Sequence, residues 1–301
     1  MSPHNAIIII PTYNEADNIV KTLNAIKNEF SNIPHKWQIS VLIVDDSSPD
    51  GTGKIVEKYR KSNPFTHLLT NRNKSGLGAA YLKGMEKAFG DMKADVIFEF
   101  DADLSHDPTK IHEFLEKIEE GFDLVLGSRY IPGGSIPEDW GWNRKFLSIV
   151  GNLFIMAILT DFRIRDWTTG YRAIRKKVYD SIQEEMHSDR FSGYTFQIGF
   201  LHKSVRSGFK VAEVPINFVD RVNGHSKLGA EYIKNTLIYI MKVRLKEILQ
   251  HRLFKFVMVG GFGAVIQLGS LSVFRNFFPY QLSYFFSVEM AVISNFIWSN
   301  L

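Results

Sequence analysis

The sequence predicts an α/β protein with an open, mostly parallel sheet, followed by a helical region that contacts a membrane. Short apolar runs alternate with stretches of helical periodicity through the first half of the chain, which is the pattern of parallel strands joined by crossover helices. Polar and acidic residues follow these runs directly. The final part of the chain changes to long, nearly uncharged segments with the length of membrane-spanning helices.

Composition is compatible with one large folded domain and an appendage. The chain has 301 residues, of which 45% are apolar, enough to bury a core. The excess of Lys and Arg (36) over Asp and Glu (32) is only +4, which does not indicate a nucleic-acid partner. Because the chain contains no cysteine, disulfides, thiolate zinc sites and cysteine nucleophiles are excluded. Any metal must bind to oxygen or imidazole ligands.

The first half supplies the predicted sheet. Its four apolar runs are Ala6–Ile10, Ile39–Val44, Val96–Phe100 and Asp123–Gly127. Helical periodicity lies between them in Asp17–Phe30 and Gly76–Phe89. The first run is too short for a secretory signal, so we expect the N-terminus to stay in the cytoplasm. Ligands of such sheets bind beyond the carboxyl ends of the strands, and the residues directly after each run are therefore expected to carry the chemistry.

Residues 131–142 are rich in Gly, Pro and Trp and predict a mobile loop over a site. Helical spacing of apolar residues follows in Asn143–Leu159 and again in Glu231–Arg252, where basic residues are interspersed. A basic amphipathic helix is expected to lie along an anionic membrane surface. The expected organisation is a catalytic domain over residues 1–230, an amphipathic interface helix over 231–252 and a transmembrane region over 253–301.

Two segments predict a transmembrane hairpin. Phe256–Phe274 contains no charge, and Leu282–Trp298 is a shorter second candidate that carries Glu289. An acid in hydrocarbon should face another helix or a lipid headgroup. Basic residues precede the first segment, namely Lys246, Arg252 and Lys255. They place the large domain on the cytoplasmic side of a multi-pass membrane protein. The alternative is a pair of buried core helices.

The second segment ends where the sequence ends, at Leu301. No flanking charge follows it. We therefore expect the transmembrane region to be truncated and the native chain to continue.

Polar motifs follow the first two predicted strands. Residues 11–15 read PTYNE and residues 45–51 read DDSSPDG. A nucleoside could be held between them, because an aspartate accepts hydrogen bonds from a base or ribose and Tyr13 offers a flat face for stacking. Each motif alone is also an ordinary helix cap or turn.

The third predicted strand leads into a pair of carboxylates, Asp101 and Asp103. Mg²⁺ commonly joins one or two carboxylates to substrate phosphates, which favours a metal site over the alternative of a capped turn. His106 is expected to be a local hydrogen-bonding residue rather than a ligand. Gly76-x-Gly78 belongs to neither a GxGxxG nor a Walker A motif, which argues against a nicotinamide-dependent dehydrogenase and a P-loop kinase.

Seven motifs taken together resemble the dolichol-phosphate mannosyltransferase family. In chain order they are PTYNE, VDDSSPDGT, KSGLGAAYLKG, DADLSHDP, GSRY, TTGYRAI and FVDRVNGHSKLG. The resemblance covers about residues 5–250. It implies a Rossmann-like GT-A fold, that of nucleotide-diphospho-sugar transferases. It also implies inverting transfer of mannose from GDP-mannose to dolichyl (polyprenyl) phosphate with Mg²⁺ or Mn²⁺.

The resemblance also implies roles for individual residues. Donor-binding positions are Pro11, Tyr13, Glu15, Val44, Asp46, Asp101, Ala102, Asp103 and Arg129. Acceptor-phosphate positions are Arg144, Arg221 and Lys227. The metal positions are Asp101, Asp103 and Ser105, where some relatives have Gln in place of Ser105, so that a weaker or water-mediated contact is expected there. The catalytic set is Asp101, Asp103, Arg129, Arg221 and Lys227.

The acceptor phosphate is anionic near neutral pH, so alignment and charge neutralisation matter more than a strong base. Asp166 either orients the sugar or acceptor or caps a loop. Two alternatives remain open. One is a polyprenyl-phosphate glucosyl- or other hexosyltransferase. The other is a catalytically silent module that binds lipid phosphate. Such a module would be expected to lack the D-x-D motif, which is formed here by Asp101 and Asp103.

Overall fold

The computed structural model describes residues 3–72, 76–188, 194–219 and 230–299. The chain divides into two compact units, Met1–Leu237 and Ile238–Leu301. The first contains an α/β sheet and the second contains helices only.

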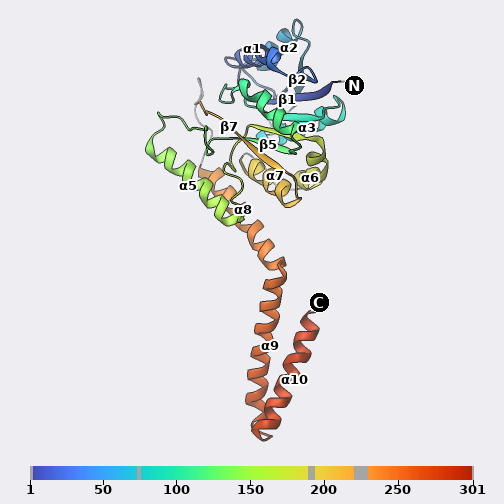
Figure 1. Cartoon of the computed structure of the whole chain (residues 1–301), viewed down its shortest axis with the longest axis vertical. Helices are drawn as coiled ribbons and strands as arrows, with labels where there is room; N and C mark the ends of the chain where they lie inside the picture. The colour runs from blue at the N-terminus through green and yellow to red at the C-terminus, as the bar shows by residue number, and fades with distance from the viewer. Residues whose placement is uncertain (1–2, 73–75, 189–193, 220–229, 300–301) are drawn as a thin grey trace. The chain divides into compact units, whose positions relative to one another are not determined.

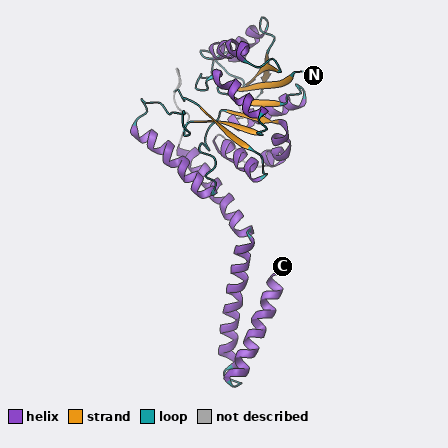
Figure 2. Cartoon of the chain, in the orientation of Figure 1, coloured by secondary structure: helices purple, strands orange, loops and turns teal. Residues whose placement is uncertain are grey.

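A seven-stranded sheet forms the centre of the first unit, with strand order β3-β2-β1-β4-β6-β5-β7, and helices flank it (Figure 2). The strands are β1 His4–Thr12, β2 Trp37–Asp45, β3 Thr66–Thr70, β4 Val96–Glu99, β5 Leu124–Ser128, β6 Arg172–Arg175 and β7 Val211–Pro215. Only β6 runs antiparallel to its neighbours, β4 and β5. The predicted open, mostly parallel sheet is confirmed.

Helices cover both faces of this sheet (Figure 1). The helices of the first unit are α1 Ile19–Asn28, α2 Thr52–Arg60, α3 Leu77–Gly90, α4 Ile111–Glu119, α5 Trp142–Leu159, α6 Lys176–Ser188 and α7 Tyr194–Arg206, with 3₁₀ turns at Glu29–Asn32 and Pro108–Lys110. Helix α8 (Ala230–Gln250) begins in the first unit and continues into the second. Helices α1, α2 and α4 share one core with β1 and β2. Helix α3 lies on the opposite face, where rings of Tyr81 and Phe196 join it to α7.

Strand β1 explains why both faces are covered. All five residues of Ala6–Ile10 are fully buried, as expected for a parallel strand between two helical layers. Alternate side chains point to opposite faces, so Ile8 enters the core that contains Leu23. Ile9 faces α3 instead, where a Cβ added to Gly84 would lie 2.6 Å from its Cγ2 atom. The helix approaches the sheet closely because Gly84 has no side chain.

The four predicted strands and the helices predicted in the first unit are all present, with end shifts of a few residues. Residues 131–141 form the predicted loop. Their backbone pairs with the segment after β7 through a bridge between Ser135 and Asn217. Strands β3, β6 and β7 were not predicted, because they are short and their polar residues break the apolar pattern.

The second unit contains α9 (Arg252–Phe274) and α10 (Tyr280–Ser299), which pack side by side (Figure 1). Among the described helices, α9 alone is long and apolar enough to cross a membrane. The hairpin is therefore present as two packed helices, but the predicted second span is not confirmed. Glu289 is exposed on α10 rather than packed against α9, and the expectation that it faces another helix or a lipid headgroup stays a prediction.

The close approach at Gly84 gives a stability prediction. Gly84→Ala should lower the melting temperature, because overpacking costs about 1–3 kcal/mol and exceeds the gain in helix propensity of about 1 kcal/mol. Gly90→Ala, on the same helix with open space around its Cβ position, is the matched control and should be neutral or stabilising. Thermal unfolding followed by circular dichroism checks both. Equal melting temperatures for the two variants would contradict the packing.

Candidate active site

The loops after β1 and β2 are joined by hydrogen bonds at the carboxyl edge of the sheet. The backbone N–H groups of Asn14, Glu15 and Ala16 donate to the side chains of Ser48 (3.1 Å), Thr52 (3.0 Å) and Asp50 (3.0 Å). The two motifs that sequence analysis assigned to a nucleoside therefore form one surface. Pro11, Tyr13 and Glu15 are partly exposed on it.

Asp45 and Asp46 have different surroundings. The Asp45 carboxylate accepts from Thr12 and Ser48 and ties the two strand ends together. Asp46 accepts from the Asn71 amide at 2.6 Å and from the Gly76 N–H at 3.1 Å. These contacts orient Asp46 beside the residues after β3. Val44 is fully buried in β2, so a contact with a donor would have to come from its backbone.

The carboxylate pair lies beyond the end of β4. Asp103 is 5% exposed, and its carboxylate accepts from the Ser105 N–H at 3.1 Å. The Asp101 carboxylate accepts from the Tyr81 hydroxyl at 3.4 Å. Burial raises the pKa of Tyr81 well above its ordinary value, so this hydroxyl remains a donor. Ala102 accepts from Thr22 of α1 through its carbonyl, which fixes the middle of the segment.

His106 is buried beside residues 101–103 and holds their backbone. Its Nδ1 accepts from the Asp101 N–H at 3.0 Å, and its ring stacks on Tyr171 at 4.8 Å. It is 3% exposed. The prediction that His106 is a local hydrogen-bonding residue is confirmed.

Residues with left-handed backbone conformation follow β1, β2 and β4, the strands that lead into the candidate site. Among the described residues, five non-glycine positions have positive φ, and three of them are Asn14, Ser47 and Leu104. They follow β1, β2 and β4 respectively. Such conformations cost energy and persist where the surrounding structure enforces them, commonly at functional sites.

The oxygen ligands that this segment offers fit a hard divalent cation that also binds substrate. Asp101 and Asp103 supply carboxylate oxygens from one short segment, with Ser105 buried beside them. Within the described residues, no group of three or more acidic or His side chains could hold an ion. Mg²⁺ commonly binds one or two carboxylates and takes its other ligands from water and phosphate, so a substrate diphosphate would have to complete the shell.

Arg129 follows β5 and is held by a carboxylate. Its Nε and Nη2 donate to the two oxygens of Asp166 at 2.7 and 2.8 Å, and Nη2 also donates to the Thr168 hydroxyl at 2.6 Å. Burial alone would raise the pKa of Asp166, but the Arg129 charge and hydrogen bonds from Arg129 and Thr168 hold that pKa below its ordinary value. Asp166 therefore orients Arg129, a role not foreseen from the sequence.

Arg129 and Arg144 lie at opposite ends of an aromatic pair. The Arg129 guanidinium is 5.6 Å from the Phe218 ring centroid, and Phe218 packs edge-on against Trp140 at 5.8 Å. Arg144, in the first turn of α5, stacks over Trp140 at 3.8 Å. Ring contacts thus link the two arginines, both of which were predicted to bind phosphate. Arg221 and Lys227 lie outside the described residues.

Residues that orient the loop before β6 escaped sequence analysis. Glu213 accepts from the N–H groups of Arg165 and Asp166, both at 3.0 Å, and the Asn152 side chain accepts from the Trp167 N–H at 2.9 Å. The only signal in the sequence is an acid inside the apolar run Val211–Pro215 and an amide inside an apolar helix.

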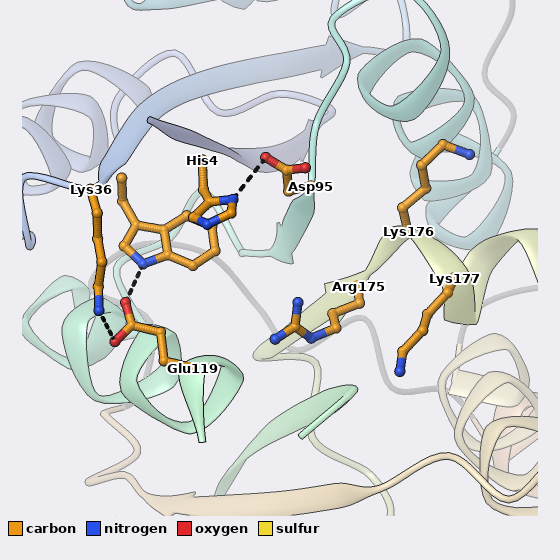
Figure 3. Close-up of a pocket in the computed structure, with 8 residues that line it drawn as sticks. His4, Lys36, Asp95, Glu119, Arg175, Lys176 and Lys177 are labelled. Atoms are coloured by element: carbon orange, nitrogen blue, oxygen red, sulfur yellow. Dashed lines mark hydrogen bonds and ion pairs between the residues drawn. The ribbon is translucent and has the colours of Figure 1, made fainter. Parts of the chain in front are cut away.

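A cavity of about 600 Å³ lies elsewhere, near the amino ends of the parallel strands (Figure 3). Its lining includes Lys36, Glu119 and Arg175. Lys36 pairs with Glu119 at 2.5 Å, and Arg175 donates to the carbonyls of Phe122 and Ile118 near the end of α4. These basic groups have structural partners, and the D-x-D lies at the opposite edge, so this cavity is not the candidate active site.

Comparison with known proteins decides the family. Residues 7–183 match the family model "Glycosyl transferase family 2". The chain belongs to glycosyl transferase family 2. It is therefore a glycosyltransferase.

Three curated relatives of this glycosyltransferase have related names. It is 36% identical to polyprenol monophosphomannose synthase of Mycolicibacterium smegmatis over 78% of this chain and 84% of that protein. It is 35% identical to undecaprenyl-phosphate mannosyltransferase of Micrococcus luteus over 78% and 92%. Dolichol-phosphate mannosyltransferase of Pyrococcus furiosus is 31% identical over 98% of this chain and 79% of that protein. The resemblance seen in the motifs is confirmed.

Solved structures show the same GT-A-like fold. Mannosyl-3-phosphoglycerate synthase from Rubrobacter xylanophilus aligns with a TM-score of 0.58 and 16% identity, covering 83% of this chain and 76% of that one. Glucosyl-3-phosphoglycerate synthase from Mycobacterium tuberculosis, in complex with Mn²⁺ and UDP-glucose, aligns with a TM-score of 0.55 and 16% identity over 80% and 79%. At such identities the likeness concerns the fold alone.

The Arg129–Asp166 pair gives a prediction for stability and activity. Asp166→Asn should cost about 3–5 kcal/mol of unfolding free energy, because it leaves a largely buried guanidinium without its counter-ion, and should reduce glycosyl transfer. Asp161→Asn is the control, since the side chain of its partner Arg163 is 80% exposed and ion pairs that reach solvent contribute about 0–1 kcal/mol.

Chemical denaturation and transfer assays of both variants provide the measurement. The depressed pKa of Asp166 also predicts how the stability of the fold changes with pH. Its stabilisation is present above the ordinary pKa of an aspartate and is lost as pH falls through the folded-state pKa. Asp166→Asn should lack this acid-dependent part. Equal losses in the two variants would contradict a special role for the buried pair.

Proposed function

We propose that this family 2 glycosyltransferase transfers mannose from GDP-mannose to a polyprenyl phosphate such as dolichyl phosphate, by direct inverting displacement at the cytoplasmic face of a membrane. The observation that carries the proposal is the set of three relatives named as polyprenyl-phosphate mannosyltransferases, which match at least 78% of this chain. The intact carboxylate pair at the end of β4 supports an active enzyme rather than a silent lipid-binding module.

The proposed donor site follows the carboxyl edge of the sheet. The nucleoside lies between the loops after β1 and β2, near Tyr13 and Asp46, because these loops form one hydrogen-bonded surface. Asp101 and Asp103, with Ser105 beside them, hold Mg²⁺ or Mn²⁺. The cation, when bound, offsets the negative charge that grows on the leaving diphosphate. Arg129 contributes its positive charge to the same task.

The acceptor phosphate is the nucleophile of the proposed reaction. Its oxygen forms the new bond to the sugar carbon while the bond from that carbon to the donor diphosphate breaks, and the nucleoside diphosphate leaves. Because the attacking oxygen is already anionic, the site has to align two phosphates rather than remove a proton. Arg144, Arg221 and Lys227 are proposed to hold the acceptor, and the aromatic pair Trp140–Phe218 would connect that group to Arg129.

Membrane attachment is proposed from two surfaces. Helix α9 has the length and composition of a membrane span, and α10 is proposed to follow it as a second, shorter span of a multi-pass region over residues 253–301. Helix α5 exposes large apolar residues, among them Trp142, Phe146, Leu147 and Leu153, and contains no acid. Basic residues before α9 favour a cytoplasmic catalytic domain over 1–230, with 231–252 as an interface helix.

The donor is tested directly. Purified full-length protein with dolichyl phosphate and Mg²⁺ or Mn²⁺ should transfer radiolabelled mannose from GDP-mannose and should not transfer glucose from UDP-glucose. Glucose transfer alone would establish the alternative, a polyprenyl-phosphate hexosyltransferase with another donor. No transfer of either sugar would contradict the proposed function.

Asp103→Asn serves as the metal-site variant in that assay and should reduce transfer by at least roughly 100-fold, as expected when a metal position is disrupted. Asp107→Asn is its control. Asp107 lies in the same loop but caps a 3₁₀ turn through Thr109, a task that asparagine also performs.

The membrane proposal is tested by fractionation. The protein should remain with membranes after carbonate washing and require detergent for extraction, because α9 exposes apolar side chains along its length that water cannot solvate cheaply. A version ending near Arg252 should extract far more easily. Soluble, monodisperse full-length protein without detergent would rule out the span.

A further inference from the structure

A buried ion pair lies in the sheet beneath the carboxylate segment. Glu99, the last residue of β4, is directly opposite Arg172 of β6 in the antiparallel register. Both side chains are 0% exposed, and Arg172 Nε lies 3.8 Å from Glu99 Oε2. Taking two charges out of water costs more than an ion pair at this separation returns. Stability alone therefore does not explain the pair.

Arg172 also anchors backbone. Its Nε donates to the carbonyl of Thr169 at 3.0 Å and its Nη1 donates to the carbonyl of Gln197 at 2.7 Å. Thr169 belongs to residues 166–170, which we name the bracing loop. The guanidinium thus ties the bracing loop to α7 by hydrogen bonds, and it faces Glu99 of β4 at ion-pair distance.

The bracing loop touches both parts of the candidate site. At its start, Asp166 and Thr168 hold the Arg129 guanidinium. At its end, Gly170 lies against His106, since a Cβ built there would be 3.7 Å from His106 Cε1. His106 in turn accepts the Asp101 N–H. One short segment therefore sets the position of Arg129 relative to the carboxylate pair.

We propose that Arg172, held in place by Glu99, is a positioning residue that fixes the bracing loop and thereby the separation between Arg129 and the Asp101–Asp103 segment. The inference rests on the proposed function in assigning both groups to the donor diphosphate and its cation. Alignment is the main task of this site, and a displacement of about 1 Å can cost about 100-fold in rate.

The test compares two arginines of the same strand. Arg172→Gln removes the anchor of the bracing loop. Arg175→Gln, at the other end of β6, removes a guanidinium that also donates to two backbone carbonyls, those of Phe122 and Ile118, and that lines the distant cavity (Figure 3). Both variants lose structural hydrogen bonds. Only Arg172→Gln loses the connection to the site.

Four quantities are measured on full-length protein: the melting temperature, kcat for sugar transfer, KM for sugar transfer, and Mn²⁺ affinity in the presence of GDP or UDP by electron paramagnetic resonance. Both variants should melt at lower temperature. Arg172→Gln should lower kcat at least tenfold and weaken nucleotide-dependent Mn²⁺ binding at least fivefold. Arg175→Gln should keep kcat and nucleotide-dependent Mn²⁺ affinity within twofold of the values for the unsubstituted protein. Equal effects of the two variants on kcat and Mn²⁺ binding would overturn the proposal.

A second variant covers the case in which Arg172→Gln does not fold. Glu99→Leu combined with Arg172→Met replaces the ion pair with apolar residues, an exchange that is often neutral or stabilising. It should fold and still show the losses in kcat and Mn²⁺ binding. A folded variant with unchanged values, or failure of both variants to fold, would mean that the pair is only structural.

The Mn²⁺ measurement separates this inference from the proposed function. If the unsubstituted protein transfers neither sugar, the proposed function fails, but the contrast between Arg172→Gln and Arg175→Gln in nucleotide-dependent Mn²⁺ binding still decides the role of Arg172. If mannose is transferred and the contrast is missing, the positioning role alone is wrong.

Discussion

Burial of parallel strands on both faces is the constraint on which the rest of this structure depends. Ala6–Ile10 in β1 has no exposed residue, so polar chemistry has no place along the strand and is confined to its ends. Parallel order brings the carboxyl ends of β1, β2 and β4 to one edge. The loops proposed to hold the nucleoside meet the carboxylate pair there for that reason. The left-handed residues Asn14, Ser47 and Leu104 reflect the sharp turns that this edge requires.

Features that depend on local pattern could be predicted from the sequence. The strands β1, β2, β4 and β5 are apolar runs, and the rule that ligands bind at the carboxyl ends of parallel strands led directly to Asp46, Asp101 and Asp103. The short strand β6 could not be recognised, because its residues RAIR read as polar when the charge is assumed to face water. Arg172 is instead fully buried, and only the fold supplies its partner, Glu99.

The same limit applies to the candidate site. Asp166 lies 37 residues from Arg129 in the chain, and Glu213 lies 47 residues from Asp166, so no local spacing connects them. Sequence analysis left Asp166 undecided between a substrate contact and a loop cap. The structure shows the loop cap, because the Asp166 carboxylate accepts from the Thr168 N–H at 3.2 Å, and it adds a pairing with Arg129 that neither alternative contained. A buried carboxylate that receives a bidentate arginine fixes where that cation points, and Glu213 fixes the carboxylate in turn through backbone N–H groups.

These contacts suit the proposed reaction, in which an acceptor phosphate attacks a sugar held by a diphosphate. A strong base would add little, because the attacking oxygen already carries charge. What limits such a reaction is bringing two anions together at one carbon, which requires cations that do not move when substrates arrive. Surface arginines lose much of their charge effect to water and rotamer freedom. Arg129 avoids this because Asp166, Thr168 and Phe218 occupy its flanks. In the roles proposed for Arg129 and Arg172, the buried polar groups beneath the sheet edge serve preorganisation, which would explain why a core retains ionic groups that apolar residues could replace.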